Sequence, residues 1–248
     1  MAGLRNAAAI ASWHLHLARW MFIHIPKNAG VSVRKTKELG GRLLSANPYF
    51  HKSRAYTRAV SETMQQLGEH HGFQHARWRD LHPKVTQRLT SVAIVRNPWA
   101  RTVSRWRFAC LAVEQGKAQS DYAAPSFEAF LEERHQWGGR EYFWHRAIRG
   151  WYPQSDYVTD EKGVIRCDIL RLEDLDSEAA RYFGLRHPLR KRNLTGRKSS
   201  DYRDFYTPQT IQIVADWYAS DIEVFGFDFH TPATRNTTYS QDYRPSVG

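Results

Sequence analysis

Cysteine is scarce in this chain: Cys110 and Cys167 are the only two among 248 residues. They form no C-x-x-C pair, which argues against a thiolate zinc site and against a disulfide-stapled scaffold, so we expect two free thiols in a reducing compartment. No run of 18 apolar residues occurs, so the sequence predicts no membrane span. With 15 glycines and 10 prolines, the chain is neither collagen-like nor of low complexity.

Apolar residues are plentiful. They make up 42% of the chain, with 13% aromatic residues and nine tryptophans, which is enough for a sizeable core and excludes an intrinsically disordered chain. The 36 lysines and arginines exceed the 25 acidic residues, and the formal net charge of +11 predicts a surface that attracts phosphate, sulfate, nucleic acid or acidic glycans. The length suits one domain over residues 1–230, and the polar segment 231–248 is predicted to be an extended or disordered tail.

The N-terminal twenty residues do not have the pattern of a signal peptide. A short alanine-rich stretch follows Arg5, but His14, His16 and Arg19 interrupt what comes after it. We therefore expect a cytoplasmic protein.

Strand and helix patterns alternate along the chain. Apolar runs at 21–25, 91–95 and 167–172 are typical of strands buried on both faces. Helical patterns cover 31–39, 98–112, 126–134 and 177–183, and a last helix is predicted between a Thr207 cap, followed by Pro208, and a stop at Gly226. This alternation predicts an α/β fold of three layers, P-loop-like, with a central, mainly parallel sheet flanked by helices.

The first chemical motif is FIHIPKNAGVSVRK, residues 22–35. A strand ends in a proline turn, and a loop from Lys27 to Gly30 leads into a helix whose first N–H groups, on Val31 and Ser32, can cradle a phosphate. Lys27 adds a positive charge and Ser32 a hydroxyl. The motif is not a Walker A loop, because G-x-x-x-x-G-K-[ST] is missing. On spacing alone, an ordinary strand–turn–helix joint with a surface lysine remains an equal alternative.

The second motif is SVAIVRNPWARTVSRW, residues 91–106. A strand delivers Arg96 at its carboxyl end, and Asn97 is the predicted cap of a helix that bears Ser104. Arg96 and Ser104 could bind a second phosphate, whereas Arg101 and Arg105, four residues apart, are expected on a solvated face. Two anion sites at the carboxyl ends of parallel strands favour a ligand with two separated phosphates.

Together these segments resemble the sulfotransferase family that uses 3′-phosphoadenosine 5′-phosphosulfate (PAPS), in a bacterial-like form of its carbohydrate-type branch. The first looks like that family's 5′-phosphosulfate loop, usually close to IHIPKTAGTS, and the second like its 3′-phosphate motif, usually close to FVRNPWDRLVSSY. The likeness continues through 153–175 and 201–227 and so covers most of the chain between residues 21 and 229. Asn28 and Val31 stand where the family usually has threonine, and at Val31 this removes one side-chain contact to the 5′-phosphate.

The resemblance implies in-line transfer of a sulfuryl group from PAPS to a hydroxyl, less readily an amine, of a saccharide or glycosylated small molecule. The product nucleotide is 3′-phosphoadenosine 5′-phosphate (PAP), and no metal is implied. Lys27 is the candidate for stabilising the departing phosphate. The predicted donor-binding residues are Pro26, Lys27, Asn28, Ala29, Gly30, Val31, Ser32, Arg96 and Ser104, with Arg197 and Lys198 from the basic segment 181–203 as a lid over the 3′-phosphate. A track for an anionic acceptor and a plain solvated loop are the alternatives for this segment.

Three histidines in GEHHGFQHARWRDL are candidates for the general base, since imidazole titrates near neutrality. His75 is favoured because its position resembles the family's histidine, and His71 comes second; His70 is a third candidate. Surface histidines without a role are the plain alternative. A metal site on His71 and His75 lacks a third ligand.

Two further groups carry weaker hypotheses. Arg171 and Glu173 match the family's R-x-E-x-L and could form a structural ion pair. An aromatic and polar cluster could stack on a sugar ring, although core and rim positions are the commoner use of such residues: Trp144, His145, Trp151, Gln154 and Tyr157.

Two other function classes stay open. A nucleotide kinase fits the phosphate sites but not the missing Walker Lys–Ser pair or the missing magnesium-binding Asp. A non-catalytic basic module for glycans or nucleic acid fits the charge, although no nucleic-acid motif occurs and we expect no nucleic-acid partner. The acceptor's identity and the oligomeric state do not follow from the sequence.

Overall fold

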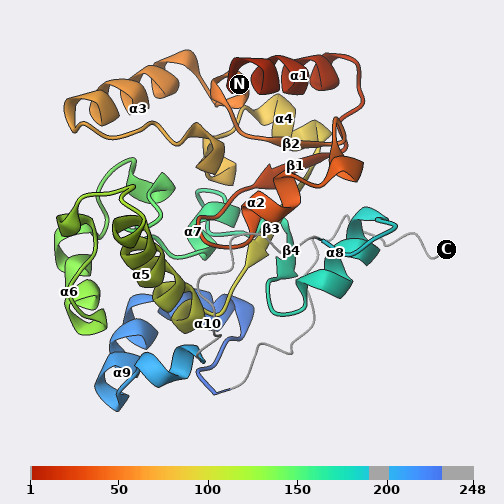
Figure 1. The fold of residues 1–248 in the computed structure, drawn as a ribbon. Coiled ribbons are helices and arrows are strands. Elements are labelled where there is room, and N and C mark those ends of the chain that lie inside the picture. The colour runs from red at the N-terminus through yellow and green to blue at the C-terminus, as the bar shows by residue number, and fades with distance from the viewer. Residues whose placement is uncertain (1, 190–200, 231–248) are drawn as a thin grey trace.

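The computed structural model describes residues 2–189 and 201–230 (Figure 1). The predicted tail at 231–248 and the predicted lid residues Arg197 and Lys198 lie outside these described ranges.

The centre of the fold is a four-stranded, all-parallel sheet with strand order β2-β1-β3-β4. The strands are β1 (Trp20–Ile23), β2 (Leu43–Ser45), β3 (Thr90–Val95) and β4 (Asp168–Arg171). Three of them overlap the three apolar runs that predicted strands, with β1 and β3 each beginning one residue before the predicted run, while the three-residue strand β2 carries too little pattern to be recognised. The predicted α/β fold with a parallel sheet is confirmed.

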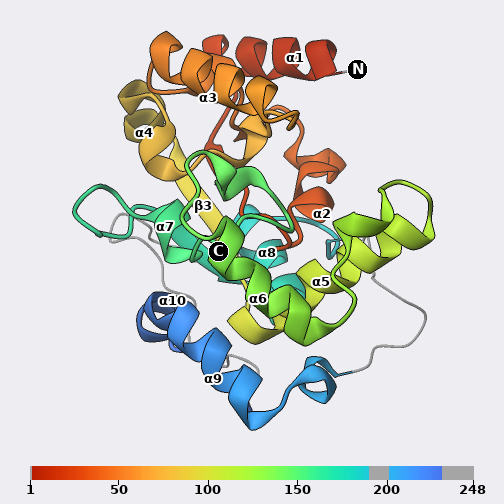
Figure 2. The same cartoon turned by 90° about the vertical axis from the view of Figure 1, so that its left-hand side faces the viewer.

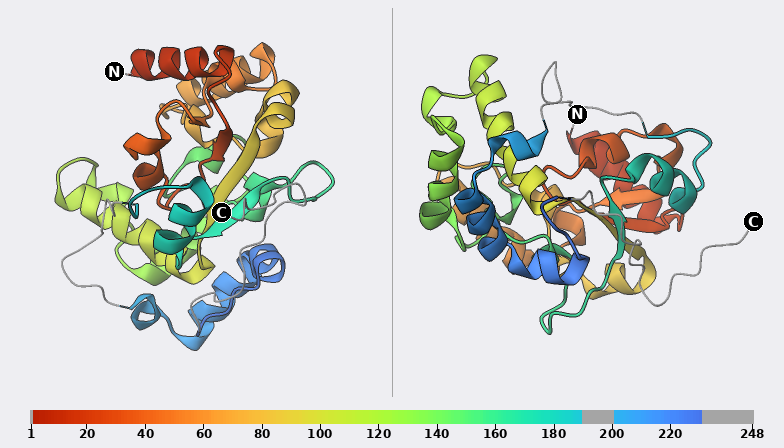
Figure 3. Two further views of the ribbon diagram at one scale, coloured as in Figure 1. Left: turned by 90° about the vertical axis from the view of Figure 1, so that its right-hand side faces the viewer. Right: turned by 90° about the horizontal axis from the view of Figure 1, so that it is seen from below.

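Alternate residues of each strand enter two separate cores, one on each face of the sheet, because successive side chains of a strand point to opposite faces. Phe22 and Ile94 pack in the smaller core with α8, whereas Met21, Ala93 and Val95 belong to the larger core. In Figure 1 and Figure 3 the helices α5 and α6 lie on one side of the sheet and α8 on the other. This is the predicted three-layer arrangement.

The helices have the following bounds. They are α1 (Ala2–His14), α2 (Gly30–Arg34), α3 (Arg54–Gln66), α4 (Pro83–Arg88), α5 (Pro98–Glu114), α6 (Phe127–Trp137), α7 (Ser155–Val158), α8 (Leu175–Phe183), α9 (Pro208–Trp217) and α10 (Ala219–Phe225), joined in part by single 3-10 turns. Helices α1 and α3 lie at one end of the molecule and α9 and α10 at the other (Figure 2). No helix in the described ranges is long and apolar enough to cross a membrane.

Two predicted helices differ from the structure. The helix predicted at 31–39 stops at Arg34, and a 3-10 turn, Lys37–Leu39, follows it. The predicted last helix has its Thr207 capping box and its left-handed Gly226 stop, but Tyr218 divides it into α9 and α10. Tyr218 is buried and its hydroxyl accepts a hydrogen bond from Arg105, so a tertiary contact accompanies the break.

Candidate functional site

A cavity of about 540 Å³ lies where β1 and β3 end, which is the edge at which parallel α/β sheets bind ligands. Side chains from both sequence motifs line it, together with residues of α8 and of the segment around His75. The residues predicted for the site that line this cavity are Pro26, Lys27, Ala29, Gly30, Val31, Ser32, His75, Arg96 and Ser104. The structure therefore brings the two motifs to one hollow. Its volume is in the range of small-molecule sites.

The loop after β1 has an unusual backbone. Lys27 and Ala29 both have positive φ, +70° and +56°, a conformation that side chains other than glycine rarely adopt. Asn28, between them, is buried and donates from Nδ2 to the carbonyl of Ile94 at 2.8 Å and to Oε1 of Gln154 at 2.6 Å. The Asn28 side chain thus anchors the loop to β3 and is not part of the cavity lining. Strained backbone of this kind persists only where surrounding contacts hold it.

Gly30 is required by a neighbour rather than by its own φ angle. A Cβ atom at this position would lie 1.9 Å from Nε2 of His24, so only glycine lets the imidazole pack here. His24 in turn stacks on Phe22 and lies 4.2 Å from the His75 ring, centroid to centroid. The start of α2 is therefore packed directly against two histidines.

The N–H groups at the start of α2 are only partly available. Ser32 donates its N–H to the carbonyl of Ala29 at 2.8 Å, which corrects the expectation that it is free. The N–H of Val31 has no backbone partner within the described ranges. The Ser32 side chain lines the cavity and is buried. Among the described residues, the N–H groups of Lys27, Asn28, Ala29 and Gly30 have no hydrogen-bond partner either, so several backbone donors of the loop remain for an anion.

Three cationic side chains line the cavity: Lys27, Arg34 and Arg96. The side chains of Lys27 and Arg96 form no hydrogen bond or ion pair in the part of the chain that the structure describes; the Lys27 ammonium lies 4.0 Å from the ring centre of Phe108, and the nearby Glu173 charge acts to raise the pKa of Arg96. Burial, with the Arg96 charge nearby, lowers the pKa of Lys27 to about 7. Burial also lowers the pKa of Arg96 to about 10, which leaves it charged at neutral pH. Burying two positive charges near each other costs free energy, and a bound anion between them offsets that cost.

Gln154 holds both phosphate-motif loops. It is fully buried; its Oε1 accepts from Asn28 and from the N–H of Arg96 at 2.8 Å, and its Nε2 donates to the Arg96 carbonyl at 2.8 Å. Asp221 of α10 accepts from the N–H groups of Gln154 and Ser155, both at 2.8 Å. Sequence analysis placed Gln154 in a sugar-stacking cluster and missed Asp221. The only signal for Gln154 was its place in the family-like segment 153–175.

The expectation that Arg101 and Arg105 form a solvated face is wrong. Both are buried, at 2% and 1% exposure. Arg101 donates to the Pro26 carbonyl of the loop at 3.4 Å and to the Tyr152 carbonyl at 3.1 Å. Arg105 donates to the Ala147 carbonyl at 3.0 Å and lies over Trp151. Guanidinium donors meet carbonyls here because the turns packed on α5 leave those oxygens without helix or sheet partners.

His75 is the predicted base that lines the cavity. Its Nδ1 lies 2.7 Å from the carbonyl oxygen of His24, so Nδ1 carries the proton and Nε2 is an acceptor. Burial lowers the pKa of His75 to about 4, so the ring is neutral at physiological pH. His71 stacks on Phe73 and His70 is exposed, and neither lines the cavity.

Several smaller predictions have definite outcomes. Asn97 caps α5 as expected, accepting from the N–H groups of Trp99 and Ala100, and its own N–H donates to Glu173. Arg171 is buried and donates to the Phe225 carbonyl. The remaining members of the predicted aromatic and polar cluster are buried core residues: Trp144, His145, Trp151 and Tyr157. Among residues 2–189 and 201–230 no group of three or more metal-ligating side chains is placed to hold a metal ion.

Comparison with known proteins agrees with this geometry. The model of the sulfotransferase family matches residues 19–228. The chain belongs to this family. No curated protein and no solved structure matches it. As a sulfotransferase, the protein transfers a sulfuryl group to an acceptor, and the matched range includes both motifs and every residue described above that lines the cavity.

Proposed function

We propose that this sulfotransferase takes its sulfuryl group from PAPS and transfers it to a hydroxyl, less readily an amine, of a saccharide or glycosylated small molecule. The observation that carries the proposal is that Lys27 and Arg96, at the ends of two parallel strands, open on one cavity, where the burial that lowers the pKa of both favours a bound anion. A nucleotide with separate 5′ and 3′ phosphates supplies one anion for each of them.

The residues at the two strand ends suit this donor. Lys27, the N–H of Val31 and the hydroxyl of Ser32 would hold the 5′-phosphosulfate, while Arg96 and Ser104 would hold the 3′-phosphate. Arg197 and Lys198 remain proposed as a lid over the 3′-phosphate. Bound PAPS supplies an activated sulfuryl group whose departure leaves charge on a phosphate oxygen.

Lys27 is placed to stabilise that developing charge. Its ammonium lies in a partly buried, desolvated position, where an electrostatic contribution to the transition state is typically about 3–4 kcal/mol. His75 is placed to accept the acceptor's proton at Nε2, because the His24 carbonyl fixes the tautomer. Neither residue needs a metal ion for these roles.

A thermal-shift experiment tests the donor. PAP is expected to stabilise the protein, and ATP with magnesium or a heparin-like polymer is expected to do so much less, because a ligand stabilises only the state that it binds. Stabilisation by ATP–magnesium alone would favour a kinase, and stabilisation by the polymer alone a binding module.

Mass spectrometry with sulfur-labelled PAPS and a panel of glycosides then detects the sulfate transferred to the acceptor.

A further inference from the structure

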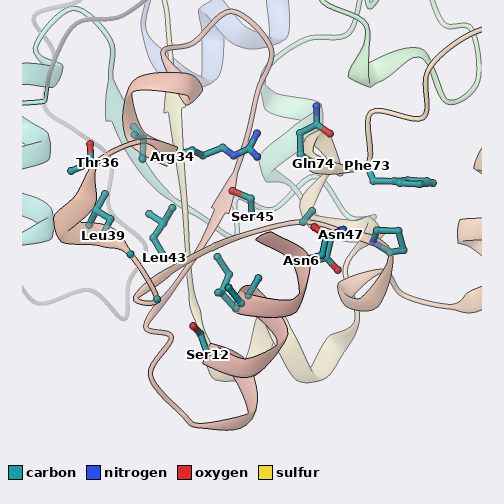
Figure 4. Close-up of a pocket in the computed structure, with 18 residues that line it drawn as sticks. Asn6, Ser12, Arg34, Thr36, Leu39, Leu43, Ser45, Asn47, Phe73 and Gln74 are labelled. Carbon is teal, nitrogen blue, oxygen red and sulfur yellow. The ribbon is translucent and has the colours of Figure 1, made fainter. Parts of the chain in front are cut away.

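A second cavity, of about 500 Å³, lies along strand β2 and beneath α1 (Figure 4). We call it the β2 cavity. In Figure 4 the Arg34 side chain extends across it toward Gln74, with Ser45 close by. The polar side chains that line it are Asn6, Ser12, Arg34, Thr36, Ser45, Asn47 and Gln74.

The β2 cavity adjoins the donor cavity. Arg34 and Gln74 line both, so the two hollows share a wall. Gln74 directly precedes His75, the proposed base, which lines the donor side. Strand β2 is also the direct neighbour of β1 in the sheet, so its carboxyl end, at Ser45, lies beside the donor loop. A molecule in the β2 cavity can therefore present a group to the donor at this shared wall.

The lining is polar but almost uncharged. Apart from Arg34, the cavity is lined by neutral side chains, and no acidic residue is among them. The hydroxyls of Ser12 and Ser45 and the amide of Gln74 form no hydrogen bond to another residue in the described ranges, so they are available to a ligand. Leu43 and other apolar residues complete the wall. Hydroxyl and amide groups beside apolar surface suit a sugar ring, whereas a lining that contains a guanidinium and no carboxylate offers an ammonium group no counter-charge.

We propose that the β2 cavity holds the acceptor as a saccharide ring and directs one of its hydroxyls, not an amine, past Gln74 to the donor. This inference rests on the proposed function. The acceptor oxygen forms the new O–S bond as the S–O bond to the departing phosphate breaks, the phosphate keeps the electron pair, and the acceptor's proton passes to Nε2 of His75. Ser12, Ser45 and Gln74 bind the hydroxyls that do not react.

Ligand-observed NMR with PAP present tests the site without requiring turnover. The probes are the methyl glycosides of glucose, glucuronic acid and glucosamine. We expect binding of a neutral or acidic glycoside and weaker binding of the amine. Ser45→Leu fills the cavity and should weaken that binding at least about tenfold. The matched control is Thr90→Leu, which places leucine at an exposed strand position at the other end of β3.

The outcomes separate this proposal from the donor assignment. Thermal stabilisation by PAP should be the same in the parent, Ser45→Leu and Thr90→Leu, which also shows that the variants fold. If PAP stabilises the parent but no glycoside binds, or if binding survives Ser45→Leu, the β2 cavity is not the acceptor site. Preferred binding of the glucosamine probe overturns the choice of a hydroxyl. Loss of the PAP effect in the parent itself overturns the proposed function instead.

Discussion

The pKa of Lys27, about 7, predicts that nucleotide affinity depends on pH. A lysine with this value is half charged at pH 7 and about one-tenth charged at pH 8. Because the 5′-phosphate binds the ammonium form, each binding event above pH 7 must first protonate Lys27. The affinity for PAP should therefore fall by up to about tenfold per pH unit above 7, which is about 1.4 kcal/mol of binding free energy for each unit. Below pH 7 the affinity should level off.

Titration of the other groups at the site does not make the affinity for PAP fall over the same pH range. Arg96 stays charged because its pKa is about 10, and His75, with a pKa of about 4, is already neutral. Burial and the adjacent His75 hold the pKa of His24 well below its usual range, so it is neutral as well. The phosphates of PAP lose their last protons near pH 6 and are fully charged above 7. Lys27 is then the group whose titration controls binding between about pH 7 and pH 9.

Isothermal titration calorimetry of PAP, in two buffers of different ionisation enthalpy, measures both the affinity and the uptake of protons. Proton uptake should approach one per nucleotide as the pH passes about 8. Lys27→Arg should bind PAP with little pH dependence, since guanidinium stays charged. Lys27→Met should bind PAP more weakly than the native chain, and its affinity should not depend on pH above 7. A flat profile for the native chain, or a slope that survives in Lys27→Met, refutes the argument.

The remaining predictions concern the chemistry and its supports. Lys27→Ala should lower kcat about 100-fold in a PAP-release assay, with PAP affinity affected less; near-normal turnover would remove Lys27 from this role. Gly30→Ala should abolish the thermal shift with PAP because of the clash with His24, and His24→Ala in the same chain should restore part of it. His75→Ala should cost about 10²–10⁴ in kcat. On the acid side, the native kcat at saturating PAPS should fall only as the pH drops toward about 4, so an acid limb near 6.5 contradicts this assignment. Gln154→Leu leaves buried polar groups unpaired and should lower the free energy of unfolding by about 2–5 kcal/mol, as urea denaturation measures.

The features that sequence predicted best are those with local causes. Apolar runs ending in proline turns indicate buried parallel strands, and the Asn97 and Thr207 caps are local hydrogen bonds that need only their own helix. The same holds for Gly226, whose left-handed φ ends α10. Lys27 and Arg96 were found because each follows a buried strand directly, and the parallel direction of the strands then places both at one edge.

The features that sequence missed depend on distant partners. An arginine pair four residues apart on a helix is typical of a solvated face, and nothing local indicates that carbonyls of other segments will surround Arg101 and Arg105. Gln154 lies 58 residues from Arg96, so its hydrogen bonds follow from the folded arrangement alone. Asn28, which the sequence analysis placed among the donor-binding residues, is instead buried and anchors the loop through its side chain. The β2 cavity forms only where α1 packs near β2, and neither segment contains a sequence motif that predicts this packing.

The supports of the donor loop explain how a strained backbone can serve transition-state stabilisation. Asn28, Gln154 and Arg101 all bind the loop or its neighbour, and none of these three residues lines the cavity. Two of the cations that line the cavity, Lys27 and Arg96, are held by their backbones and keep their charged groups for the ligand. Such preorganised charge needs no rearrangement when negative charge develops, which is the condition under which electrostatic stabilisation is largest. Removing a support should therefore lower kcat/KM for PAPS even where PAP still binds. Ligand contacts can re-form the loop, but both the bound state and the transition state then bear that cost relative to the free enzyme.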